Sequence, residues 1–522
     1  MARFLTLHDP RAARRYYDAG LWRADTLYAL LARNADARPN AEALRDGGRR
    51  LDWAALKAWV DSLAAGLAAR GLAPGARVSL WLPNRADAVA AFLACSRQGL
   101  ACNPSLHRST THAEIAGLLR RLDTALLVSE AAVDGVPAVA PEALAGDAAR
   151  LGAPADDPDQ VSYLAFTSGT TGEPKCVMHS DNTLLANARD LVRDWGHGPD
   201  MRLLTLSPLT HHIAWVAVAQ WLVAGGTLIV DDAPAPMDRL DWLLETRPTY
   251  VMGVPTHAID MLAAQNRRGL ARLGEVRVFY MAGAPIPAAV AEAFVAQGVK
   301  PQNVYGMTEN SSHQYTHADD DTETIVATCG RGGPAYEVRI FAPDDPDRAL
   351  PAGEVGQIGG RGAALMLGYF ADQRATEASF NRDGWFMSGD LGVLDSRGNL
   401  SIVGRLKDLI IRGGRNIQPA RIEDLALRHA GVDKAAVFPV ADARLGEKAC
   451  IAVLGSVAAE SLLAHLAAQG LPRYDMPEYF LRLESFPLTP SGKVLKRALV
   501  EAVRRGELAP EPVRFAARKE DA

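Results

Sequence analysis

A run of glycine and hydroxyl residues that ends in a lysine is the clearest chemical signal in this 522-residue sequence. Residues 167–175 read TSGTTGEPK and directly follow the short apolar run VSYLAF. Glycine lets the backbone approach a ligand, serine and threonine hydroxyls donate hydrogen bonds, and lysine neutralises negative charge. Because the run follows a predicted strand, it suits the phosphates of a nucleotide. The candidate phosphate-binding residues are Thr167, Ser168, Gly169, Thr170, Thr171, Gly172 and Lys175.

Two other interpretations of this run are weaker. It is not a Walker A loop, because that pattern requires a second glycine directly before its lysine and Pro174 occupies that place. A flexible polar linker is the remaining alternative. A run of this composition with a Pro-Lys end seldom occurs as a linker, so phosphate binding is the preferred interpretation.

The TSGTTGEPK run closely resembles the signature loop of the adenylate-forming superfamily. This superfamily includes acyl-CoA synthetases, aryl-acid ligases, luciferases and the adenylation domains of peptide synthetases. Its other motifs follow in the family's order, and the resemblance covers the chain from about residue 25 to Arg497. One departure is Cys176, where the family usually has glycine; this change removes no phosphate donor.

A second motif, VYGMTE at residues 304–309, resembles the family's Tyr-Gly-x-Thr-Glu element. The resemblance implies that Tyr305 and Gly306 lie at the adenine, that Thr308 meets the α-phosphate, and that Glu309 holds Mg²⁺. A hard carboxylate oxygen is a suitable ligand for Mg²⁺, and Mg²⁺ suits phosphate oxygens. A strand end with a buried tyrosine and a surface glutamate is the alternative for this motif alone.

Two further motifs imply contacts to the ribose of the nucleotide. GWFMSGD at residues 384–390 resembles a family block in which Asp390 accepts hydrogen bonds from both ribose hydroxyls. GRLKD at residues 404–408 resembles the block in which Arg405 also reaches the ribose. Lys407 stands where the family places the hinge between its two domains. Without its neighbours, this second run would suit a solvated charged turn equally well.

The C-terminal part of the chain carries the predicted catalytic lysine. PLTPSGK at residues 487–493 resembles the family's mobile loop, which implies that Lys493 offsets charge between the carboxylate and the α-phosphate. The resemblance also places Gly413 and Gly414 at the channel for coenzyme A. Arg415 and Arg421 stand where relatives often have glutamate, which puts two family ion pairs in doubt.

The acid-binding pocket is predicted from two segments. PLTHHIAW at residues 208–215 resembles a segment of fatty-acyl-type synthetases, which implies that His211 lies near the reacting carboxylate and that His212 and Trp215 belong to the acyl pocket. Packed core side chains are the alternative for these residues. The AGAP run resembles the turn beside the adenine and the acyl group, formed by Gly283, Ala284 and Pro285.

The nature of the acid is predicted only by class. An aspartate that would grip the ammonium group of an amino acid is not apparent in the PLTHHIAW segment. YYDAGLW at residues 16–22 and GEKAC at residues 446–450 also resemble cyclohexanecarboxylate-CoA and dihydroxybenzoate-AMP ligases. We therefore expect a medium-sized aliphatic, alicyclic or aromatic carboxylic acid.

These motifs require an α/β scaffold. Helical spacing at residues 53–70 and 86–97 alternates with strand patterns at 77–82, 161–166, 226–230, 250–254 and 276–281. After about residue 400, strand patterns at 435–440, 450–454 and 479–483 surround helical patterns at 420–429 and 461–469. We predict a large N-terminal, multi-subdomain α/β domain that binds AMP and acid (residues 1–404) and a small mobile α+β C-terminal domain with the catalytic lysine (residues 405–522).

Composition excludes several classes of function. The formal net charge of −5 offers no basic field for nucleic acid. The sequence lacks an apolar run of the roughly 20 residues that a membrane helix requires. The N-terminus is rich in arginine, but Asp9 and Asp18 break the pattern of a transit peptide. Five scattered cysteines indicate a reducing compartment, so a cytoplasmic protein is expected. A homodimer is left open.

The motifs together predict an acid–thiol ligase that uses ATP, Mg²⁺ and coenzyme A. It would adenylate a carboxylic acid and then pass the acyl group to CoA. Two alternatives remain open: an acyl- or aryl-AMP ligase that loads a carrier protein in trans, and a catalytically inactive binding protein with the same fold.

Overall fold

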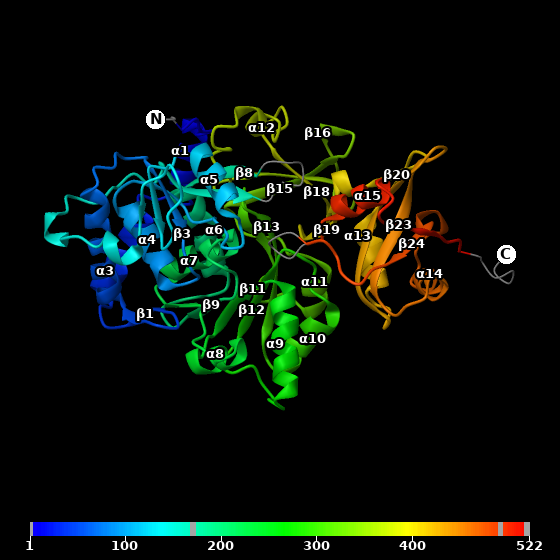
Figure 1. Ribbon diagram of the computed structural model, residues 1–522, viewed down its shortest axis with the longest axis horizontal. Coiled ribbons are helices and arrows are strands. Elements are labelled where there is room, and N and C mark those ends of the chain that lie inside the picture. Colours follow the sequence, from blue (N-terminus) through cyan, green and yellow to red (C-terminus); the bar gives the residue numbers. More distant parts are fainter. Residues whose placement is uncertain (1–3, 168–173, 489–493, 516–522) are drawn as a thin grey trace. The chain divides into compact units, whose positions relative to one another are not determined.

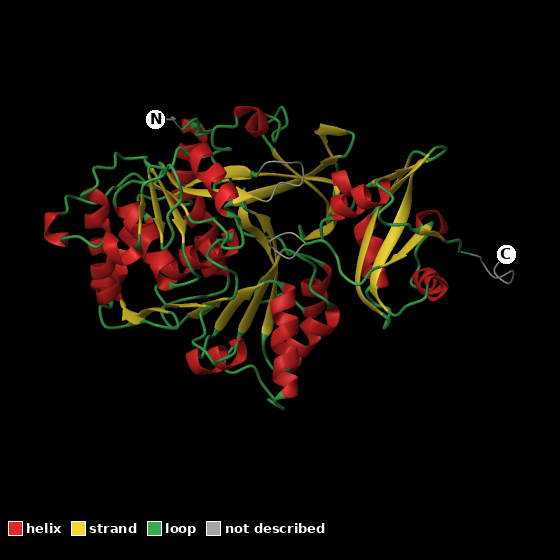
Figure 2. Ribbon diagram, viewed as in Figure 1, coloured by secondary structure: helices red, strands yellow, loops and turns green. Residues whose placement is uncertain are grey.

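The computed structural model describes residues 4–167, 174–488 and 494–515. Figures 1 and 2 show helices and strands alternating along the chain. The chain divides into two compact units. Unit 1 comprises Met1–Val338, Gly360–Phe386 and Asp395–Ser401, and unit 2 comprises Arg339–Gly359, Met387–Leu394 and Ile402–Ala522. The domain boundary after residue 404 stays a prediction.

Two sheets of mainly parallel strands form the framework of unit 1. The larger sheet has the order β14-β13-β12-β11-β9-β10-β1-β2, with parallel neighbours from β13 to β1. The smaller has the order β6-β5-β3-β4-β7-β8, with β8 antiparallel to β7. The strands of the larger sheet are β1 (Glu42–Arg45), β2 (Arg50–Asp52), β9 (Arg202–Thr205), β10 (Thr227–Val230), β11 (Tyr250–Gly253), β12 (Val278–Ala282), β13 (Lys300–Met307) and β14 (Ser311–Tyr315). Those of the smaller are β3 (Arg77–Trp81), β4 (Ala101–Asn103), β5 (Leu126–Ser129), β6 (Ala138–Val139), β7 (Val161–Thr167) and β8 (Lys175–Ser180).

The helices of unit 1 pack on these sheets. They are α1 (Pro10–Asp18), α2 (Leu27–Ala37), α3 (Trp53–Ala68), α4 (Ala86–Arg97), α5 (His112–Arg121), α6 (Asp181–Asp194), α7 (His212–Ala224), α8 (Arg239–Thr246), α9 (Pro255–Arg267), α10 (Ala288–Ala296), α11 (Thr322–Ala327) and α12 (Gln373–Glu377), with the one-turn helices η1 (Pro141–Leu144) and η2 (Ala148–Arg150). One buried cluster unites both sheets with α2, α3, α4, α6 and α7. A second cluster covers the other face of the larger sheet with α8, α9 and α10.

The residues of the larger sheet alternate between these two clusters, as the period of a strand requires. In β11, Tyr250 and Met252 belong to the first cluster, whereas Val251 belongs to the second. Both faces are therefore apolar, which explains the nearly continuous hydrophobic runs of these strands in the sequence.

A third sheet has five strands in the order β16-β15-β17-β18-β19, and its residues divide between the two units. Its strands are β15 (Tyr336–Ala342), β16 (Asp345–Ala349), β17 (Gly356–Gly362), β18 (Phe386–Leu394) and β19 (Leu400–Arg405). Strands β18 and β19 carry the predicted ribose-binding residues Asp390 and Arg405.

The C-terminal part of unit 2 is an α+β structure. Its sheet has the order β21-β20-β23-β24-β25, with β22 paired to β23. The elements are η3 (Leu406–Asp408), β20 (Ile410–Arg412), β21 (Arg415–Ile417), α13 (Pro419–Ala426), β22 (Val432–Asp442), β23 (Gly446–Gly455), α14 (Ala459–Ala468), η4 (Arg473–Asp475), β24 (Tyr479–Arg482), α15 (Lys496–Arg504) and β25 (Glu511–Pro512). In β22, Val437 packs in a cluster with α13 and α14, whereas Phe438 packs in a cluster with α15.

The predicted helices and strands are confirmed within a few residues at their ends. For example, the helix predicted at residues 86–97 is α4, and the strand predicted at 250–254 is β11. None of the helices in the described ranges is long and apolar enough to cross a membrane.

Candidate functional site

The phosphate loop joins two paired antiparallel strands. Thr167 at the end of β7 pairs with Lys175 at the start of β8, and the Thr167 hydroxyl donates to the Lys175 carbonyl over 3.4 Å. Ser168, Gly169, Thr170, Thr171 and Gly172 lie outside the described residues. The buried Cys176 pairs with Phe166 in the same hairpin, so the departure from the family glycine is accommodated within β8.

A tight turn between β13 and β14 carries the predicted α-phosphate and Mg²⁺ ligands. Gly306 is required there, because a Cβ atom at this position would lie 1.8 Å from the Ser311 carbonyl oxygen. The Met307 amide donates to Oδ1 of Asn310 over 3.0 Å, which closes the turn. Thr308 and Glu309 occupy the turn itself, so the sequence YGMTE places two oxygen-bearing side chains on a short, fixed segment.

Glu309 is connected to the strand that leaves the phosphate loop. The Tyr369 hydroxyl donates to Oε1 of Glu309 over 2.9 Å, and the Lys175 ammonium lies 4.6 Å from the centre of the Tyr369 ring. Burial and the Glu309 charge raise the pKa of Tyr369, so its hydroxyl stays protonated and donates. The Met366 amide also donates to the Glu309 carbonyl over 2.7 Å. Tyr369 thus contacts the Lys175 ammonium through its ring and the Glu309 carboxylate through its hydroxyl.

These residues fit a Mg²⁺ ion that is shared with nucleotide phosphates. Mg²⁺ is commonly bound by one or two carboxylates together with phosphates and water, not by a full set of protein ligands. Glu309 supplies a hard oxygen donor. Among residues 4–167, 174–488 and 494–515, groups of three or more His, Cys, Asp or Glu side chains that could hold a metal by themselves are absent.

Two stacked histidines lie behind this turn. The rings of His179 on β8 and His212 on α7 are 5.5 Å apart and nearly parallel. His212 contacts the Tyr163 hydroxyl through Nδ1 (3.2 Å) and the Ser311 hydroxyl through Nε2 (3.0 Å). Burial lowers the pKa of His212 well below its usual value, so the ring is neutral at physiological pH. The predicted acyl-pocket residue His212 is therefore part of a hydrogen-bonded network.

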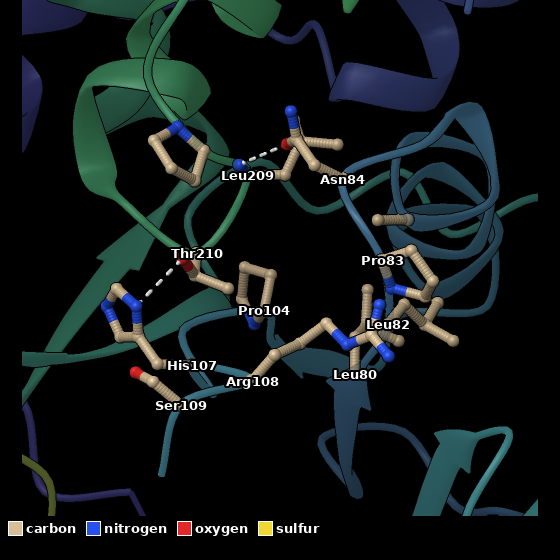
Figure 3. A pocket seen from close by; sticks show the side chains of 12 residues that line it. Leu80, Leu82, Pro83, Asn84, Pro104, His107, Arg108, Ser109, Leu209 and Thr210 are labelled. Atoms are coloured by element: carbon tan, nitrogen blue, oxygen red, sulfur yellow. Dashed lines mark hydrogen bonds between the residues drawn. The ribbon is translucent and has the colours of Figure 1, made fainter. Parts of the chain in front are cut away.

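His211 precedes α7, directly after Thr210, which lines a cavity of about 250 Å³ (Figure 3). His211 itself is not among the lining residues. Its ring meets that of His107 edge to face at 4.7 Å between centres. His107 lines the cavity, and its Nδ1 lies 3.3 Å from the Thr210 hydroxyl. The remaining lining is formed by Leu80, Leu82, Pro83, Asn84, Ala88, Pro104, Arg108, Ser109, Pro208 and Leu209. The loops after β3, β4 and β9 contribute most of this lining, so the cavity lies at the carboxyl ends of parallel strands, where α/β proteins commonly bind ligands.

Trp215 lies in the protein core. Its side chain is 2% exposed and packs against Phe92 at 4.3 Å between ring centres. The indole N–H donates to the Leu209 carbonyl over 2.7 Å, so Trp215 holds one wall of the cavity in place. It does not itself line the cavity. Its role in the acyl pocket stays a prediction.

The predicted adenine-binding segments end neighbouring parallel strands. Ala282 of β12 pairs with Val304 of β13, so Gly283 and Tyr305 follow at the same edge of the sheet. Gly283 has a φ of +91°, which favours glycine. The predicted turn residues Gly283, Ala284 and Pro285 are exposed. The ring of Tyr305 meets the buried His313 edge to face at 5.4 Å.

The predicted ribose ligands are paired within unit 2. Nε of Arg405 lies 3.1 Å from Oδ1 of Asp390, which is 7% exposed. The Asp390 amide donates to the Ser388 hydroxyl over 3.1 Å. Lys407 follows in η3. The structure therefore brings Asp390 and Arg405 together, whereas their contacts with the ribose and the role of Lys407 as a hinge stay predictions.

The predicted glycines of the CoA channel form the turn of the β20–β21 hairpin. Gly413 and Gly414 have φ values of +58° and +84°. Two successive positive φ values define a two-residue hairpin turn that glycine accommodates best. Arg412 before the turn forms a two-pronged ion pair with Glu478, at 2.7 and 2.9 Å. Arg415 after the turn pairs with Asp475 at 2.8 Å.

The two departures from the family pattern thus have different outcomes. Arg415 forms an ion pair with Asp475 of η4, so an ion pair is present although arginine replaces the family's glutamate at this position. Arg421 donates to the Gly470 carbonyl over 3.4 Å and has no ion pair among the described residues. Glu423 nearby forms an ion pair with Lys496 at 2.7 Å.

Lys493 lies outside the described residues, as do residues 489–492. The residues on both sides of them pair with each other: Leu488 bridges to Val494, and the Leu495 amide donates to the Pro487 carbonyl over 2.8 Å. Lys496 begins α15, where Leu499 is buried against the sheet. The chain segments that flank the predicted catalytic lysine are therefore fixed to unit 2.

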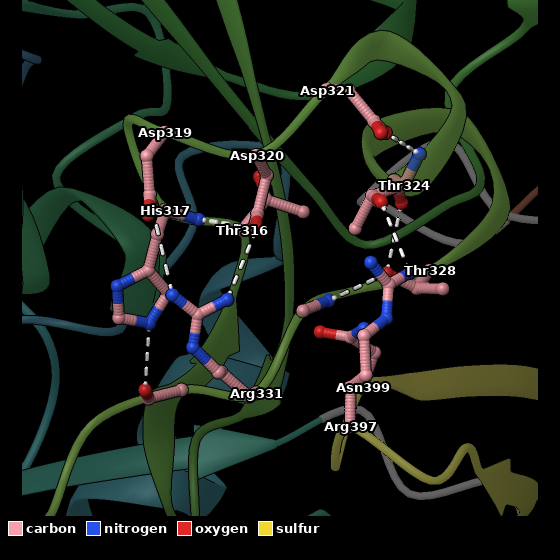
Figure 4. Close-up of polar contacts among 12 residues, drawn as sticks. Thr316, His317, Asp319, Asp320, Asp321, Thr324, Thr328, Arg331, Arg397 and Asn399 are labelled. Atoms are coloured by element: carbon pink, nitrogen blue, oxygen red, sulfur yellow. Dashed lines mark hydrogen bonds and ion pairs between the residues drawn. The ribbon is translucent and has the colours of Figure 1, made fainter.

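An acidic run after β14 has a structural role (Figure 4). Asp320 and Asp319 form ion pairs with Arg331 at 3.0 and 3.6 Å. Asp321 caps α11 by accepting from the Thr324 amide over 2.7 Å. Each carboxylate has a partner in the chain, so this run does not resemble a second metal site.

Two residues near the site were not predicted from the sequence. Tyr369 lies in a run, LGYF, that carries no charge or metal ligand, and only its contact with Glu309 identifies it. His179 lies in the strand after the phosphate loop, where a buried histidine reads as an ordinary core residue. The available signal was a histidine directly after the apolar run CVM.

Known proteins share this architecture and these motifs. The family described as AMP-binding enzyme matches residues 31–370, and the AMP-binding enzyme C-terminal domain matches residues 421–493. The feruloyl-CoA synthase of Amycolatopsis sp is 34% identical and covers 89% of this chain and 96% of its own. The medium-chain fatty-acid–CoA ligase of Escherichia coli (strain K12) is 28% identical over 96% of this chain and 94% of its own.

A solved structure agrees with the fold. O-succinylbenzoate coenzyme A synthetase from Bacillus subtilis, in complex with ATP and magnesium ion, aligns with a TM-score of 0.81 at 27% identity and covers 90% of this chain and 98% of its own. The predicted α/β architecture with a smaller C-terminal part is confirmed. With one family match over more than half of its length and relatives aligned nearly from end to end, the chain belongs to the AMP-binding enzymes, the adenylate-forming superfamily that its motifs predict.

Proposed function

We propose that this chain joins a small-molecule carboxylic acid to coenzyme A in two steps driven by ATP. The first step forms an acyl-adenylate and releases pyrophosphate. In the second step the CoA thiol displaces AMP and gives acyl-CoA. The family and the named CoA ligases among its relatives support an AMP-forming acyl-CoA synthetase that uses ATP, Mg²⁺ and CoA.

The observation that carries this proposal is the contact of Tyr369 with both Lys175 and Glu309. Lys175 leaves the phosphate loop, and Glu309 lies beside Thr308 on the β13–β14 turn. A cation and a carboxylate so arranged can serve the phosphates and the ion that accompanies them. A scaffold protein without nucleotide chemistry would not require this pairing.

In the adenylation step, a carboxylate oxygen attacks the α-phosphorus of ATP and pyrophosphate leaves. This is a phosphoryl-type displacement, so the protein contributes alignment and charge neutralisation. Thr167 to Lys175 would hold the phosphates, Thr308 would donate to the α-phosphate, and Lys493 would offset charge between the reacting groups. Mg²⁺ held by Glu309 would neutralise phosphate oxygens. Tyr305, Asp390 and Arg405 would hold the adenosine.

In the second step the C-terminal domain rotates about Lys407, by resemblance to the family. The rotation would withdraw Lys493 and bring the Gly413–Gly414 turn to the thiol. Hinge closure of this kind is a common device in enzymes with two half-reactions. The β20–β21 hairpin supports this proposal, because its turn consists of two exposed glycines, which leave the backbone groups uncovered by side chains.

The cavity beside His211 is proposed to receive the apolar part of the acid. Seven of its lining residues are apolar: Leu80, Leu82, Pro83, Ala88, Pro104, Pro208 and Leu209. Burial lowers the pKa of His107, so the imidazole next to His211 is neutral. A largely apolar pocket of about 250 Å³ would accept the apolar part of a medium-sized aliphatic, alicyclic or aromatic acid.

A hydroxylamine-trapping screen tests the proposed reaction. The purified chain with MgATP should form hydroxamates and release pyrophosphate with at least one medium-sized acid. Addition of CoA should then yield acyl-CoA with one AMP per thioester. Adenylate formation without transfer to CoA would favour the carrier-protein alternative. No pyrophosphate across short, medium, alicyclic and aromatic acids would favour an inactive binding protein.

A cytoplasmic location and a homodimer complete the proposal. All five cysteines are free and buried, which is compatible with a reducing compartment. Fractionation of the native host and light scattering of the purified protein would test the two statements separately.

A further inference from the structure

A buried histidine connects the phosphate-loop strand to the turn that carries Thr308 and Glu309. His179 lies on β8, four residues after Lys175, and its side chain is fully buried. Nε2 lies 2.6 Å from the Thr308 carbonyl oxygen, and Nδ1 lies 3.0 Å from the Thr183 hydroxyl. The ring therefore bridges the start of α6 and the β13–β14 turn.

The hydrogen-bond partners of the His179 ring determine which of its nitrogens carries the proton. Nε2 must carry the proton, because a carbonyl oxygen can only accept. Nδ1 then carries no proton and can accept a hydrogen bond from the Thr183 hydroxyl. The same hydroxyl also lies 3.0 Å from the Ser180 carbonyl oxygen. Burial lowers the pKa of His179 to about 4, so the ring is neutral and keeps this arrangement near neutral pH.

The same turn is held from a second side. His212 stacks on His179 and contacts the Ser311 hydroxyl, which begins β14. Ser311 has a φ of +56°, an uncommon conformation for a residue with a side chain. The turn thus depends on side-chain contacts, because its local backbone conformation alone is unfavourable.

We infer that His179 is a positioning residue for adenylation: its bond to the Thr308 carbonyl sets the place of Thr308 and Glu309 relative to the strand that leaves the phosphate loop. His179 does not touch the reacting atoms. This inference rests on the proposed function, in which Thr308 and Glu309 serve the α-phosphate and Mg²⁺. A small displacement of such groups can reduce the rate by up to about 100-fold.

Two variants of His179 distinguish the effect of its hydrogen bond to Thr308 from the effect of having any polar side chain at this position. In His179→Gln, the amide nitrogen can reach approximately the place of Nε2 and can donate to Thr308. In His179→Asn, the side chain is one methylene shorter and stays near Thr183. We expect the Asn variant to release pyrophosphate about tenfold more slowly or worse, with a higher Mg²⁺ concentration at half-maximal rate, and the Gln variant to remain within about threefold of the parent.

Separate assays of the two half-reactions, and a control at another buried histidine, test whether the slower adenylation reflects only a general loss of stability. Both variants should convert supplied acyl-adenylate and CoA at nearly the parental rate. His197 stacks on Tyr250 at 4.4 Å and makes no contact with the turn among the described residues, so the matched pair His197→Gln and His197→Asn should behave alike. Equal adenylation rates for the two His179 variants would overturn the inference, as would an equal loss in both half-reactions.

Hydrogen–deuterium exchange supplies a readout that does not require activity. Amides of residues 304–311 should exchange faster in His179→Asn than in His179→Gln, with little change elsewhere. Equal exchange in this segment would also overturn the inference. If the parent protein releases no pyrophosphate with any acid, the proposed function fails, whereas the exchange comparison still decides whether His179 positions the turn.

Discussion

The Tyr369 hydroxyl donates a hydrogen bond to Oε1 of Glu309 over 2.9 Å, while the Lys175 ammonium lies above the ring of the same tyrosine. Tyr369→Phe removes only the hydroxyl and keeps the aromatic face for Lys175. A hydrogen bond to a charged group contributes about 1.5–3 kcal/mol. We therefore expect adenylation to slow by about tenfold or more, with a higher Mg²⁺ requirement, in a pyrophosphate-release assay.

The control for this change is Tyr280→Phe. Tyr280 is also buried, and its hydroxyl contacts the Ser312 hydroxyl at 2.6 Å instead of Glu309. This variant should alter thermal stability but not the Mg²⁺ concentration at half-maximal rate. A similar Mg²⁺ dependence in both variants would contradict the role given to Tyr369.

Lys493 and Lys407 should affect opposite half-reactions. Lys493→Ala should reduce pyrophosphate release by about 10²–10³-fold, because it removes a preorganised cation, and should leave the attack of CoA on supplied acyl-adenylate largely intact. Lys407→Pro should do the reverse by restricting the hinge. The two assays on each variant are the measurement, and equal losses in both would count against domain rotation.

The ion pairs beside the Gly413–Gly414 turn should matter for the thioester step. Arg412 and Glu478 are both partly exposed, so their pair should add about 1 kcal/mol or less to stability. Arg412→Gln and Glu478→Gln should each slow acyl transfer to CoA, and the double variant should be no slower than either single one. Fully additive losses would show that the two residues act independently.

Asp181 should make stability fall as pH rises. Burial raises the pKa of this carboxyl from 3.8 to about 6, so the folded chain keeps a proton that the unfolded chain releases between those values. Unfolding free energy from this group should therefore decrease by about 2 kcal/mol from pH 4 to pH 6 and become level above about pH 7. Urea unfolding of the parent and of Asp181→Asn at several pH values measures the difference.

The Asp181→Asn side chain can still accept from the Leu27 amide, which donates to Asp181 over 2.8 Å. The free energy of unfolding of Asp181→Asn should therefore increase relative to that of the parent as pH rises from 4 to 6. Asp36→Asn removes one exposed carboxylate and serves as the control for net charge. A pH-independent difference between parent and Asp181→Asn would refute the assignment.

Ala88→Leu should narrow the cavity beside His211. Ala88 lies on α4, is 4% exposed and lines the cavity. Filling this space should lower kcat/KM for larger acids by at least about tenfold, while short acids are affected little. Equal losses for all acids would contradict an acyl pocket, and a selective rise in the KM for CoA would assign the cavity to the thiol instead.

Much of the fold could be predicted because its signals are local and periodic. α4 and β11 have clear apolar patterns, and the positive φ of Gly413 and Gly414 follows from a hairpin that needs them. The motifs could be ordered along the chain, since each has a composition that its chemistry requires. Glu309 and Lys175 can therefore be identified from the sequence alone.

The contacts between distant segments could not be predicted in the same way. Tyr369 is 60 residues from Glu309, and His179 is 129 residues from Thr308. Neither tyrosine nor histidine is unusual at a buried position, so the sequence pattern does not indicate that these residues contact Glu309 and Thr308. Trp215 shows the opposite case: a motif that suggested a pocket wall belongs to a side chain packed in the core.

Both loops that the chemistry depends on are closed at their base by antiparallel pairs, Thr167 with Lys175 and Leu488 with Val494. A segment bounded in this way can be exchanged as a cassette, because the paired residues on either side define its length and entry direction. Segments from related ligases could thus be grafted between these two stems to alter the rate of adenylation without redesigning the surrounding sheets.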